Sequence, residues 1–205
     1  LIVKPNREGS GKGITITSVV RNKAELEREV SKTSRTYRQE ILVEEFIDGR
    51  ELTVGILGNY PPATMPILEI DFSNCRASGE FFYTWKVKEF EKEVEDSKGL
   101  SPFWHCPARI TAAEAALVKE TAIRAFNALG CVDLSRVDII LDKKGVPYVL
   151  EVNPLPGLDP VDSNFPFVGK CAGLDYPALM NRILETAVER HTKNGNLALQ
   201  ERSIR

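Results

Sequence analysis

SRVDIILDKKGVPYVLEVN, residues 135–153, is the stretch of sequence from which the fold is most directly predicted. Two runs that are rich in β-branched residues flank a charged turn that contains Gly145. This pattern is typical of an antiparallel β-hairpin. We predict a four-residue loop over 143–146 between the two strands, and the rest of the chain is interpreted outward from this hairpin.

The polar residues of the hairpin are predicted to meet on one face. Side chains alternate along a strand, so Arg136 and Asp138 share a face of the first strand. On the returning strand, Val149, Glu151 and Asn153 are expected to share a face. The four-residue loop places Asp138 opposite Glu151 and Arg136 opposite Asn153, because a slip of one residue would turn one set over. Two carboxylates, an amide and a guanidinium then form one patch.

This patch suits a divalent cation. Directly opposed like charges destabilise a strand pair, which favours a functional role for the two acids. Mg²⁺ usually takes one or two carboxylates and completes its octahedron with water and phosphate oxygens. The stretch therefore favours a magnesium–nucleotide site at Asp138, Glu151 and Asn153. The alternative that the stretch leaves open is a solvated face on which Arg136 neutralises the acids.

Composition limits the class of protein. The 205 residues are 42% hydrophobic and 27% charged, which is ordinary for a globular protein with a core of its own. A formal net charge of −2 disfavours nucleic acid as a partner, and no apolar run approaches the roughly 18 residues of a membrane span. Four cysteines without a C-x-x-C spacing predict a cytoplasmic location. The chain begins at Leu1 without an initiator Met, so we expect it to be part of a longer protein.

A glycine-rich loop over 6–13 follows a short predicted strand over 1–5. It is not a Walker A loop, because Gly13 follows Lys12 where that motif requires Ser or Thr. The alternating segment 14–19 predicts a strand, so the loop is expected to be a hairpin loop between two strands. Its backbone N–H groups can close on an anion, and a plain flexible hairpin is the alternative.

The other elements are predicted from capping residues and periodicity. They are helices over 22–37, 111–129 and 175–190, and strands over 41–47, 51–58 and 66–72. Residues 73–107 lack a regular pattern, which is typical of a functional or disordered loop. Glu44 and Glu51 stand on either side of the turn dipeptide Asp48-Gly49 and are candidates to bind an adenine amino group and ribose hydroxyls.

Three blocks stand in order along the chain and are specific when taken together. They are Lys4-Pro5-x₃-Gly9-Ser10-x₂-Gly13, Val43-Glu44-Glu45-Phe46-Ile47-x-Gly49-x-Glu51, and Arg136-x-Asp138 with Leu150-Glu151-Val152-Asn153-x-x-Pro156-Gly157. Over about residues 1–190 the chain resembles the ATP-grasp superfamily, and within it the C-terminal part of D-alanine–D-alanine ligases.

The resemblance implies an α+β ATP-grasp fold, in which two α+β lobes with mainly antiparallel sheets sandwich ATP. Residues 1–46 are expected in the smaller lobe, with the phosphate loop and the adenine strand. Residues 47–193 are expected in the larger catalytic lobe with the magnesium site, and 194–205 in a tail. The N-terminal substrate domain of the family is absent from this sequence.

The resemblance also implies the site residues and the cofactors, which are ATP and Mg²⁺, with Mn²⁺ as a substitute. The nucleotide-binding residues are Lys4, Ser10, Gly11, Lys12, Gly13, Glu44, Glu45, Phe46, Ile47 and Glu51. Asp138, Glu151 and Asn153 match the metal ligands. Arg136 and Gly157 match residues that steady the reacting carboxyl group, and Lys88 in Phe82-Tyr83-x₄-Lys88 matches a flexible-loop lysine at the γ-phosphate.

The implied activity is ATP-dependent ligation of a carboxylate to an amine, as in peptidoglycan biosynthesis. An acyl phosphate forms first, the amine attacks it, and ADP and phosphate are released. The partners are then a small amino acid or peptide and the N-terminal domain, with no nucleic acid or membrane, and a homodimer is left open. Alternatives are a ligase for another amino acid or peptide, a nucleotide-binding regulatory module without turnover, and a structural α+β domain.

The chain departs from the family pattern at three places. After Asn153 the usual Thr-x-Pro-Gly-Met-Thr is replaced by Pro154-Leu155-Pro156-Gly157-Leu158-Asp159, His-Ser by Asp162-Ser163, and Lys-Tyr by Lys88-Glu89. These changes leave the nucleotide and metal residues intact but put D-alanine specificity in question. Without the N-terminal domain, this piece is expected to bind Mg-ATP weakly and to ligate poorly.

Overall fold

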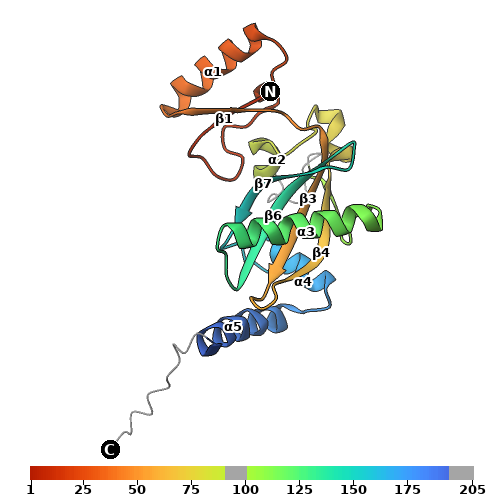
Figure 1. Ribbon diagram of the computed structural model, residues 1–205. Coiled ribbons are helices and arrows are strands. Elements are labelled where there is room, and N and C mark those ends of the chain that lie inside the picture. The colour runs from red at the N-terminus through yellow and green to blue at the C-terminus, as the bar shows by residue number, and fades with distance from the viewer. Residues whose placement is uncertain (91–100, 194–205) are drawn as a thin grey trace, which may run out of the picture. The chain divides into compact units, whose positions relative to one another are not determined.

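The computed structural model describes residues 1–90 and 101–193 (Figure 1). They form two compact units. Unit 1 consists of Leu1–Arg50 with the described part of Ile70–Trp104, and unit 2 consists of Glu51–Glu69 with the described residues from His105 onward. The described residues 70–90 and 101–104 thus group with the first fifty residues.

Unit 1 combines a small antiparallel sheet with helices. Its elements are β1 (Ile2–Pro5), η1 (Ile16–Ser18), α1 (Lys23–Tyr37), β2 (Ile41–Glu44), η2 (Phe72–Ser78) and α2 (Trp85–Phe90). β1 pairs with β2 in a register that places Ile2 opposite Glu44. α1 begins where the sequence predicts, because the Asn22 side chain accepts a hydrogen bond from the backbone N–H of Glu25 at 3.0 Å.

The segment after the glycine-rich loop is not the strand predicted over 14–19. The 3₁₀-helix η1 forms there instead: the Thr15 amide donates to Ser18 Oγ at 3.0 Å, and the Ser18 amide donates to the Thr15 carbonyl at 2.9 Å. These local bonds occupy backbone groups that a strand would offer to a neighbour. The segment meets β1 at an isolated bridge between Ile2 and Val19. The antiparallel partner of β1 is β2, which follows α1 in the chain, so the glycine-rich loop does not connect two strands.

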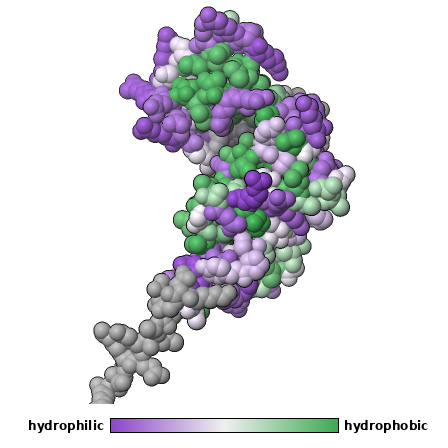
Figure 2. All heavy atoms as spheres, viewed as in Figure 1, coloured by the Kyte–Doolittle hydropathy of each residue, from purple (hydrophilic) through white to green (hydrophobic). Residues whose placement is uncertain are grey.

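β2 is shorter and more exposed than the buried strand predicted over 41–47. It ends at Glu44, and Leu42 and Val43 are 37% and 40% exposed. A two-stranded sheet buries little on its own, which explains the exposure. Figure 2 shows hydrophobic residues gathered on the visible face of unit 1 and framed by hydrophilic residues.

The larger sheet has five strands in the order β5-β4-β3-β6-β7. Its strands and the helices that follow the first unit are β3 (Gly49–Leu57), β4 (Ala63–Asp71), β5 (Phe103–His105), α3 (Ala112–Ala128), β6 (Leu134–Asp142), β7 (Pro147–Asn153), α4 (Asn164–Cys171) and α5 (Tyr176–Lys193). α3 begins at the predicted capping box, in which the Glu114 amide donates to Thr111 Oγ1 at 3.2 Å and the Glu114 carboxylate accepts from the Thr111 amide.

Helices cover both faces of this sheet. α3 runs across one face (Figure 1) and packs on the main apolar core. That core consists of Leu52, Val54, Ile56, Ile67, Val118, Ala122, Phe126, Val137, Ile139 and Leu141. α4 packs on the other face, where the ring of Phe165 lies 3.5 Å from the position of a Cβ on Gly55. Even-numbered residues of β6 point to this second face, which is where the polar patch lies.

Some elements of unit 2 and of the segment 73–107 were not predicted. α2 and β5 lie inside the segment described as irregular, and residues 91–100 lie outside the described part. α4 was missed because Pro166 and Gly169 resemble helix breakers. Pro166 stands in the first helical turn, where no intrahelical N–H bond is lost. The tail predicted over 194–205 also lies outside the described residues.

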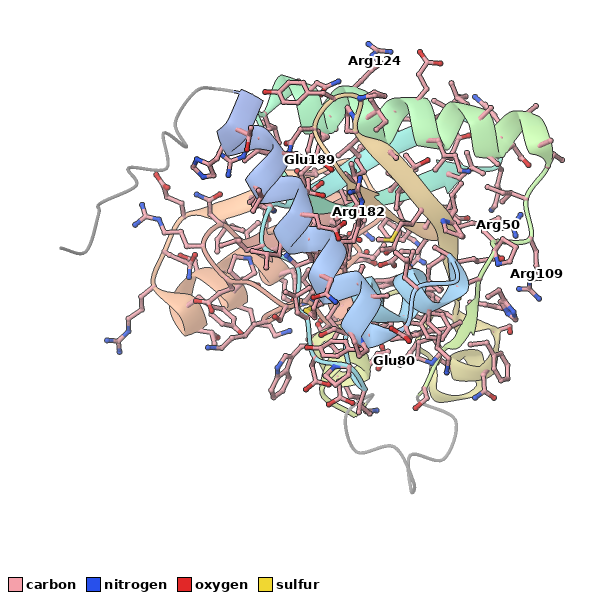
Figure 3. All side chains as sticks on the ribbon, turned by 90° about the horizontal axis from the view of Figure 1, so that it is seen from below. Arg50, Glu80, Arg109, Arg124, Arg182 and Glu189 are labelled. Atoms are coloured by element: carbon pink, nitrogen blue, oxygen red, sulfur yellow. The ribbon has the colours of Figure 1, made fainter. Side chains whose placement is uncertain are left out.

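Within the described part of the chain, none of the helices has the length and apolar character needed to cross a membrane. α5 carries ion pairs along its exposed side. Arg182 lies 3.0 Å from a Glu189 carboxylate oxygen, and Figure 3 shows both residues on this helix. Such exposed pairs contribute little to stability.

A less exposed ion pair attaches α5 to the sheet. The Arg190 guanidinium donates to both oxygens of Asp133 at 2.9 and 2.8 Å, and the Asn59 amide donates to the same carboxylate at 2.9 Å. The Arg190 bonds, opposed in part by burial and aided by Asn59, hold the pKa of Asp133 below its ordinary value. The stabilisation is therefore fully present above about pH 4 and is lost as pH falls through the lowered pKa.

Replacing Asp133 by asparagine is expected to lower the free energy of unfolding at pH 7 by about 1–3 kcal/mol, because charged hydrogen bonds are lost. The difference from wild type should shrink below about pH 4, where the wild-type carboxylate is also protonated. Urea unfolding at pH 7 and at pH 3 measures both values. Asp175→Asn is the control, because Asp175 caps α5 through the Ala178 amide and asparagine caps equally well. A difference that is independent of pH would contradict the linkage.

Candidate functional site

The four polar residues of the β6–β7 hairpin meet on one patch, as the sequence predicts. Asp138 lies opposite Glu151, and Arg136 lies opposite Asn153. The Arg136 guanidinium donates from Nε to Asp138 Oδ1 at 3.0 Å and from a terminal nitrogen to Oδ2 at 2.8 Å. The same terminal nitrogen lies 3.5 Å from a Glu151 carboxylate oxygen. One guanidinium thus contacts both facing acids and offsets their repulsion.

The turn of this hairpin differs from the prediction. The Asp142 amide donates to the Val146 carbonyl at 3.0 Å, so three residues rather than the four of 143–146 form the loop. Gly145 has a φ of 79°, the left-handed conformation that favours glycine in such a loop. Without a further irregularity, this shorter loop would shift the pairing by one residue and bring Leu150, rather than Glu151, opposite Asp138.

A β-bulge corrects the shift before it reaches the polar patch. The register changes between Asp138 and Ile139: Asp138 faces Glu151, whereas Ile139 faces Val149. Leu150 is the extra residue on β7. Because directly opposed side chains share a face, Val149 lies with Ile139 and not with Glu151, so the prediction that Val149 shares the polar face is wrong. The predicted pairing of the acids is right, although it arises from a shorter loop and a bulge.

Two further donors hold the Asp138 carboxylate. Thr53 of β3 donates its hydroxyl to Asp138 Oδ1 at 2.8 Å, and Asn153 Nδ2 lies 3.4 Å from Oδ2 and 3.2 Å from a Glu151 oxygen. Asp138 is only 8% exposed, so these bonds compensate for its burial. Sequence reasoning missed Thr53. Its only signal was a polar residue inside the apolar strand β3, because the pairing of β3 with β6 is not local.

The donor set fits a magnesium ion better than a transition metal. Within the described residues, no three His, Cys, Asp or Glu side chains come together to hold a metal. Asp138 and Glu151 supply two carboxylates, and Asn153 supplies an amide that can offer its oxygen if the amide group turns over. Mg²⁺ usually takes one or two carboxylates and leaves its other positions to water and phosphate. The residues present therefore suit this ion.

In unit 1 the structure brings Lys88 to the glycine-rich loop. The Lys88 side chain lies 3.4 Å from the position of a Cβ on Gly11, and the Trp85 amide donates to the Ile14 carbonyl at 3.0 Å. Lys12 in the loop lies 3.5 Å from the Glu8 carboxylate. α2 is thus held against the loop. Lys88 and Gly11, two predicted phosphate-binding residues that lie far apart in the sequence, are neighbours in the structure.

Gly13 is the position of the loop that least tolerates a side chain. Its φ is +84°, and a Cβ there would lie 2.5 Å from Pro5 Cγ and 2.9 Å from the Tyr37 ring. Gly13→Ala is therefore expected to lower the free energy of unfolding of unit 1 by about 2 kcal/mol or more, because left-handed strain adds to overpacking. Chemical denaturation measures this loss.

The same loop provides a matched control. Gly9 has open space around the position of its Cβ, so Gly9→Ala is expected to stay within about 0.5 kcal/mol of wild type. Equal stability of the Gly13→Ala and Gly9→Ala variants would contradict the close contact with Pro5 and Tyr37.

The predicted adenine strand lies beside the first strand of unit 1. Lys4 and Glu44 form an ion pair across β1 and β2. Phe46, two residues beyond β2, contacts Phe81 and Phe82 edge to face, with ring centroids 6.2 and 5.6 Å away. Phe81 and Phe82 were not predicted as site residues, although the aromatic run that contains them was visible in the sequence.

Gly157 lies in the loop after β7, where its backbone closely approaches another residue. A Cβ at Gly157 would stand 2.6 Å from Ser163 Oγ, so a side chain there would displace the Ser163 hydroxyl. Ser163 Oγ accepts from the Asp159 amide at 3.2 Å. The Asp162 and Val161 amides donate to the Asp159 carboxylate and lower its pKa. The loop is thus folded through its own polar groups.

The predicted site residues divide between the two units. Lys4, Ser10, Gly11, Lys12, Gly13, Glu44, Glu45, Phe46, Ile47 and Lys88 belong to unit 1. Glu51, Arg136, Asp138, Glu151, Asn153 and Gly157 belong to unit 2. Within unit 1 the structure joins Lys88 to the loop and Lys4 to Glu44, and within unit 2 it joins the four hairpin residues.

The chain is similar to several known ligases. A D-alanine–D-alanine ligase of Methylacidiphilum infernorum is 36% identical over 95% of this chain and 57% of that protein. The crystal structure of D-alanine–D-alanine ligase from Bacillus anthracis complexed with ATP matches with a TM-score of 0.67 and 25% identity, over 94% of this chain and 54% of that one. The VanG D-Ala:D-Ser ligase from Enterococcus faecalis matches with a TM-score of 0.68 and 29% identity, over 90% and 48%.

The chain spans about half the length of the curated relatives that it matches. The likeness to solved structures confirms the predicted α+β ATP-grasp fold. The family described as D-ala D-ala ligase C-terminus matches residues 1–185, close to the extent that the motifs suggested. The chain belongs to this family of D-alanine–D-alanine ligase C-terminal domains.

Proposed function

We propose that the protein is an ATP-dependent carboxylate–amine ligase that acts through an acyl phosphate and releases ADP and phosphate. The observation that supports this most is the pairing of Asp138 with Glu151, both in contact with Arg136, on the β6–β7 hairpin. Two facing acids on a strand pair would be destabilising without a cationic partner, and their oxygens suit Mg²⁺. The relative from Bacillus anthracis was solved as a complex with ATP.

Asp138, Glu151 and Asn153 are the residues that we assign to Mg²⁺, which Mn²⁺ can replace. When bound, the ion neutralises phosphate oxygens and orients the triphosphate. The assignment is supported by the opposed carboxylates and by the Asn153 amide that bridges them.

The phosphates of ATP are assigned to Lys4, Lys88 and the loop over 10–13. The loop is suited to an anion, because Gly11 and Gly13 adopt positive φ and backbone N–H groups in such turns converge. Lys88 beside Gly11 adds positive charge. Glu44 to Ile47 are assigned to the adenine, which is consistent with the strand end and the aromatic contacts of Phe46, and Glu51 to the ribose.

The proposed reaction needs no nucleophile from the protein. A carboxylate oxygen of the first substrate attacks the γ-phosphorus, the bond to ADP breaks, and an acyl phosphate forms. The amine of the second substrate attacks the acyl carbon, the tetrahedral oxyanion collapses, and phosphate leaves with the electron pair of the C–O bond while the amine loses a proton. Arg136 and the Gly157 amide are the donors assigned to the oxyanion.

The substrates are proposed to be D-amino acids that are joined into a D-alanyl dipeptide for peptidoglycan biosynthesis. The names of the relatives support D-alanine as one substrate and show two different amines, D-Ala and D-Ser. We place the reaction in the cytoplasm, a reducing compartment that suits a chain whose four cysteines have no C-x-x-C spacing.

The test is a product assay on the full-length protein, not on this piece alone, with ATP, Mg²⁺ and a panel of D- and L-amino acids offered in pairs. ADP and phosphate should be released in proportion to ligated product, and only when a suitable pair is present. AMP and pyrophosphate as products would contradict the acyl-phosphate route. ATP binding by calorimetry without turnover for any pair would indicate a regulatory module instead.

A further inference from the structure

A buried threonine of the neighbouring strand contacts the Asp138 carboxylate. Thr53 lies on β3, which is next to β6 in the sheet, and its hydroxyl donates to Asp138 Oδ1 at 2.8 Å. Thr53 is 1% exposed, and the bond joins residues 85 positions apart. A buried hydroxyl requires a hydrogen-bond partner, and here that partner is the acid in the polar patch.

The two oxygens of Asp138 have different surroundings. Oδ1 accepts from Thr53 at 2.8 Å and from Arg136 Nε at 3.0 Å. Oδ2 lies on the side of the facing strand, with Asn153 Nδ2 at 3.4 Å, a terminal nitrogen of Arg136 at 2.8 Å and Arg136 Nε, which both oxygens share, at 3.2 Å. That terminal nitrogen also contacts Glu151. Oδ2 is therefore the oxygen that faces the other assigned metal ligands, while Oδ1 is turned toward β3.

Thr53 is placed to restrict the rotation of this carboxylate, together with Arg136, which contacts both oxygens. The terminal torsion of aspartate is broad, so only contacts to its oxygens determine which way the group faces. The χ1 torsion of threonine is restricted by its branched Cβ, and the burial of Thr53 limits it further. A hydrogen bond from a stiff side chain on a central strand thus fixes Oδ1 and leaves Oδ2 directed toward Glu151 and Asn153.

We propose that Thr53 is a positioning residue for the divalent cation site, acting through Asp138. The inference rests on the proposed function, because it needs Asp138 to be a metal ligand. Partners that orient metal ligands typically change metal affinity 10- to 100-fold when they are removed. Thr53→Val, which keeps the shape and deletes the hydroxyl, should therefore weaken cation binding about 10-fold or more, and Thr53→Ser should restore it.

The experiment titrates Mn²⁺ alone into the protein and measures free Mn²⁺ by electron paramagnetic resonance. Thr84→Val is the matched control: Thr84 is also 1% exposed and also donates to a carboxylate, Glu80, at 2.8 Å, but it belongs to unit 1. Thr53→Val and Thr84→Val should both lower the melting temperature, because each removes a buried hydrogen bond. Only Thr53→Val should weaken Mn²⁺ binding.

The outcomes separate this inference from the proposed function. Wild-type binding that is lost in Asp138→Asn but unchanged in Thr53→Val would overturn the role of Thr53 and leave the metal site standing. Equal weakening by Thr53→Val and Thr84→Val would also overturn it, because the effect would follow stability alone. Absence of Mn²⁺ binding in wild type, or undiminished binding in Asp138→Asn, would contradict the metal site and the role of Thr53 with it.

Discussion

Asp138→Asn is expected to lower ATP turnover by about 10²-fold or more and to raise the Mg²⁺ concentration that gives half-maximal rate. The substitution keeps the shape of the side chain and removes the charge that the proposed cation requires. Metal-ion catalysis contributes several kcal/mol, and about 1.4 kcal/mol corresponds to a factor of ten in rate. Asparagine also presents an NH₂ group to a neighbourhood of donors, because Arg136 and Asn153 already donate to this position.

Asp142→Asn is the matched control for this change. Asp142 lies four residues further along the same face of β6 and accepts from the Lys144 and Val146 amides of the turn at 2.8 Å. Asparagine forms the same turn, so turnover should stay within about twofold of wild type. Phosphate release measured over a range of Mg²⁺ concentrations compares the two variants. A magnesium dependence that is unchanged in Asp138→Asn would remove Asp138 from the metal site.

The elements predicted correctly are those whose signals are local. The Asn22 and Thr111 caps act on the backbone of the next turn, so they place the starts of α1 and α3 without reference to the rest of the fold. The strands of the β6–β7 hairpin are similarly visible as two β-branched runs around a glycine turn.

The register of the hairpin could be predicted only in part. The side-chain pattern requires Asp138 and Glu151 to share a face, and the structure agrees. How the chain reaches that register was not predictable, because a three-residue loop with a bulge at Leu150 and a four-residue loop without a bulge give the same pairing at the patch. The bulge changes the pairing of the residues between it and the turn, Val149, Tyr148 and Pro147, and so places Val149 on the other face.

Non-local contacts account for most of what the sequence did not reveal. The bond from Thr53 to Asp138 depends on β3 lying beside β6, and the approach of Lys88 to Gly11 depends on α2 packing against the loop. No periodicity within either segment encodes these neighbours. The prediction of a strand over 14–19 failed for the opposite reason. The alternation suited a strand, but the Ser18 side chain binds the backbone amide of Thr15 and favours a local turn of helix instead.

Variants of Arg136 separate its effect on the free energy of unfolding from its effect on the rate of ligation. Arg136→Met removes the cation that contacts both facing acids, so the free energy of unfolding should fall by about 1–3 kcal/mol. Arg136→Lys keeps the charge and should recover part of that loss. Lysine is a point charge and cannot reproduce the fork that reaches both oxygens of Asp138. Ligation should therefore fall by about 10²-fold or more in both variants, if the guanidinium also serves the oxyanion.

Arg109→Met is the control for the general loss of an arginine–carboxylate pair. Arg109, labelled in Figure 3, contacts the buried Glu69 carboxylate at 3.3 Å within unit 2 and away from the β6–β7 hairpin in the strand order. Its loss should reduce stability and leave the rate per folded molecule unchanged. Urea unfolding and a single-turnover assay measure the two quantities on the same samples. If Arg136→Lys ligates at close to the wild-type rate, then Arg136 supports the acids by charge alone, and the donor to the oxyanion must be sought at Gly157 and elsewhere.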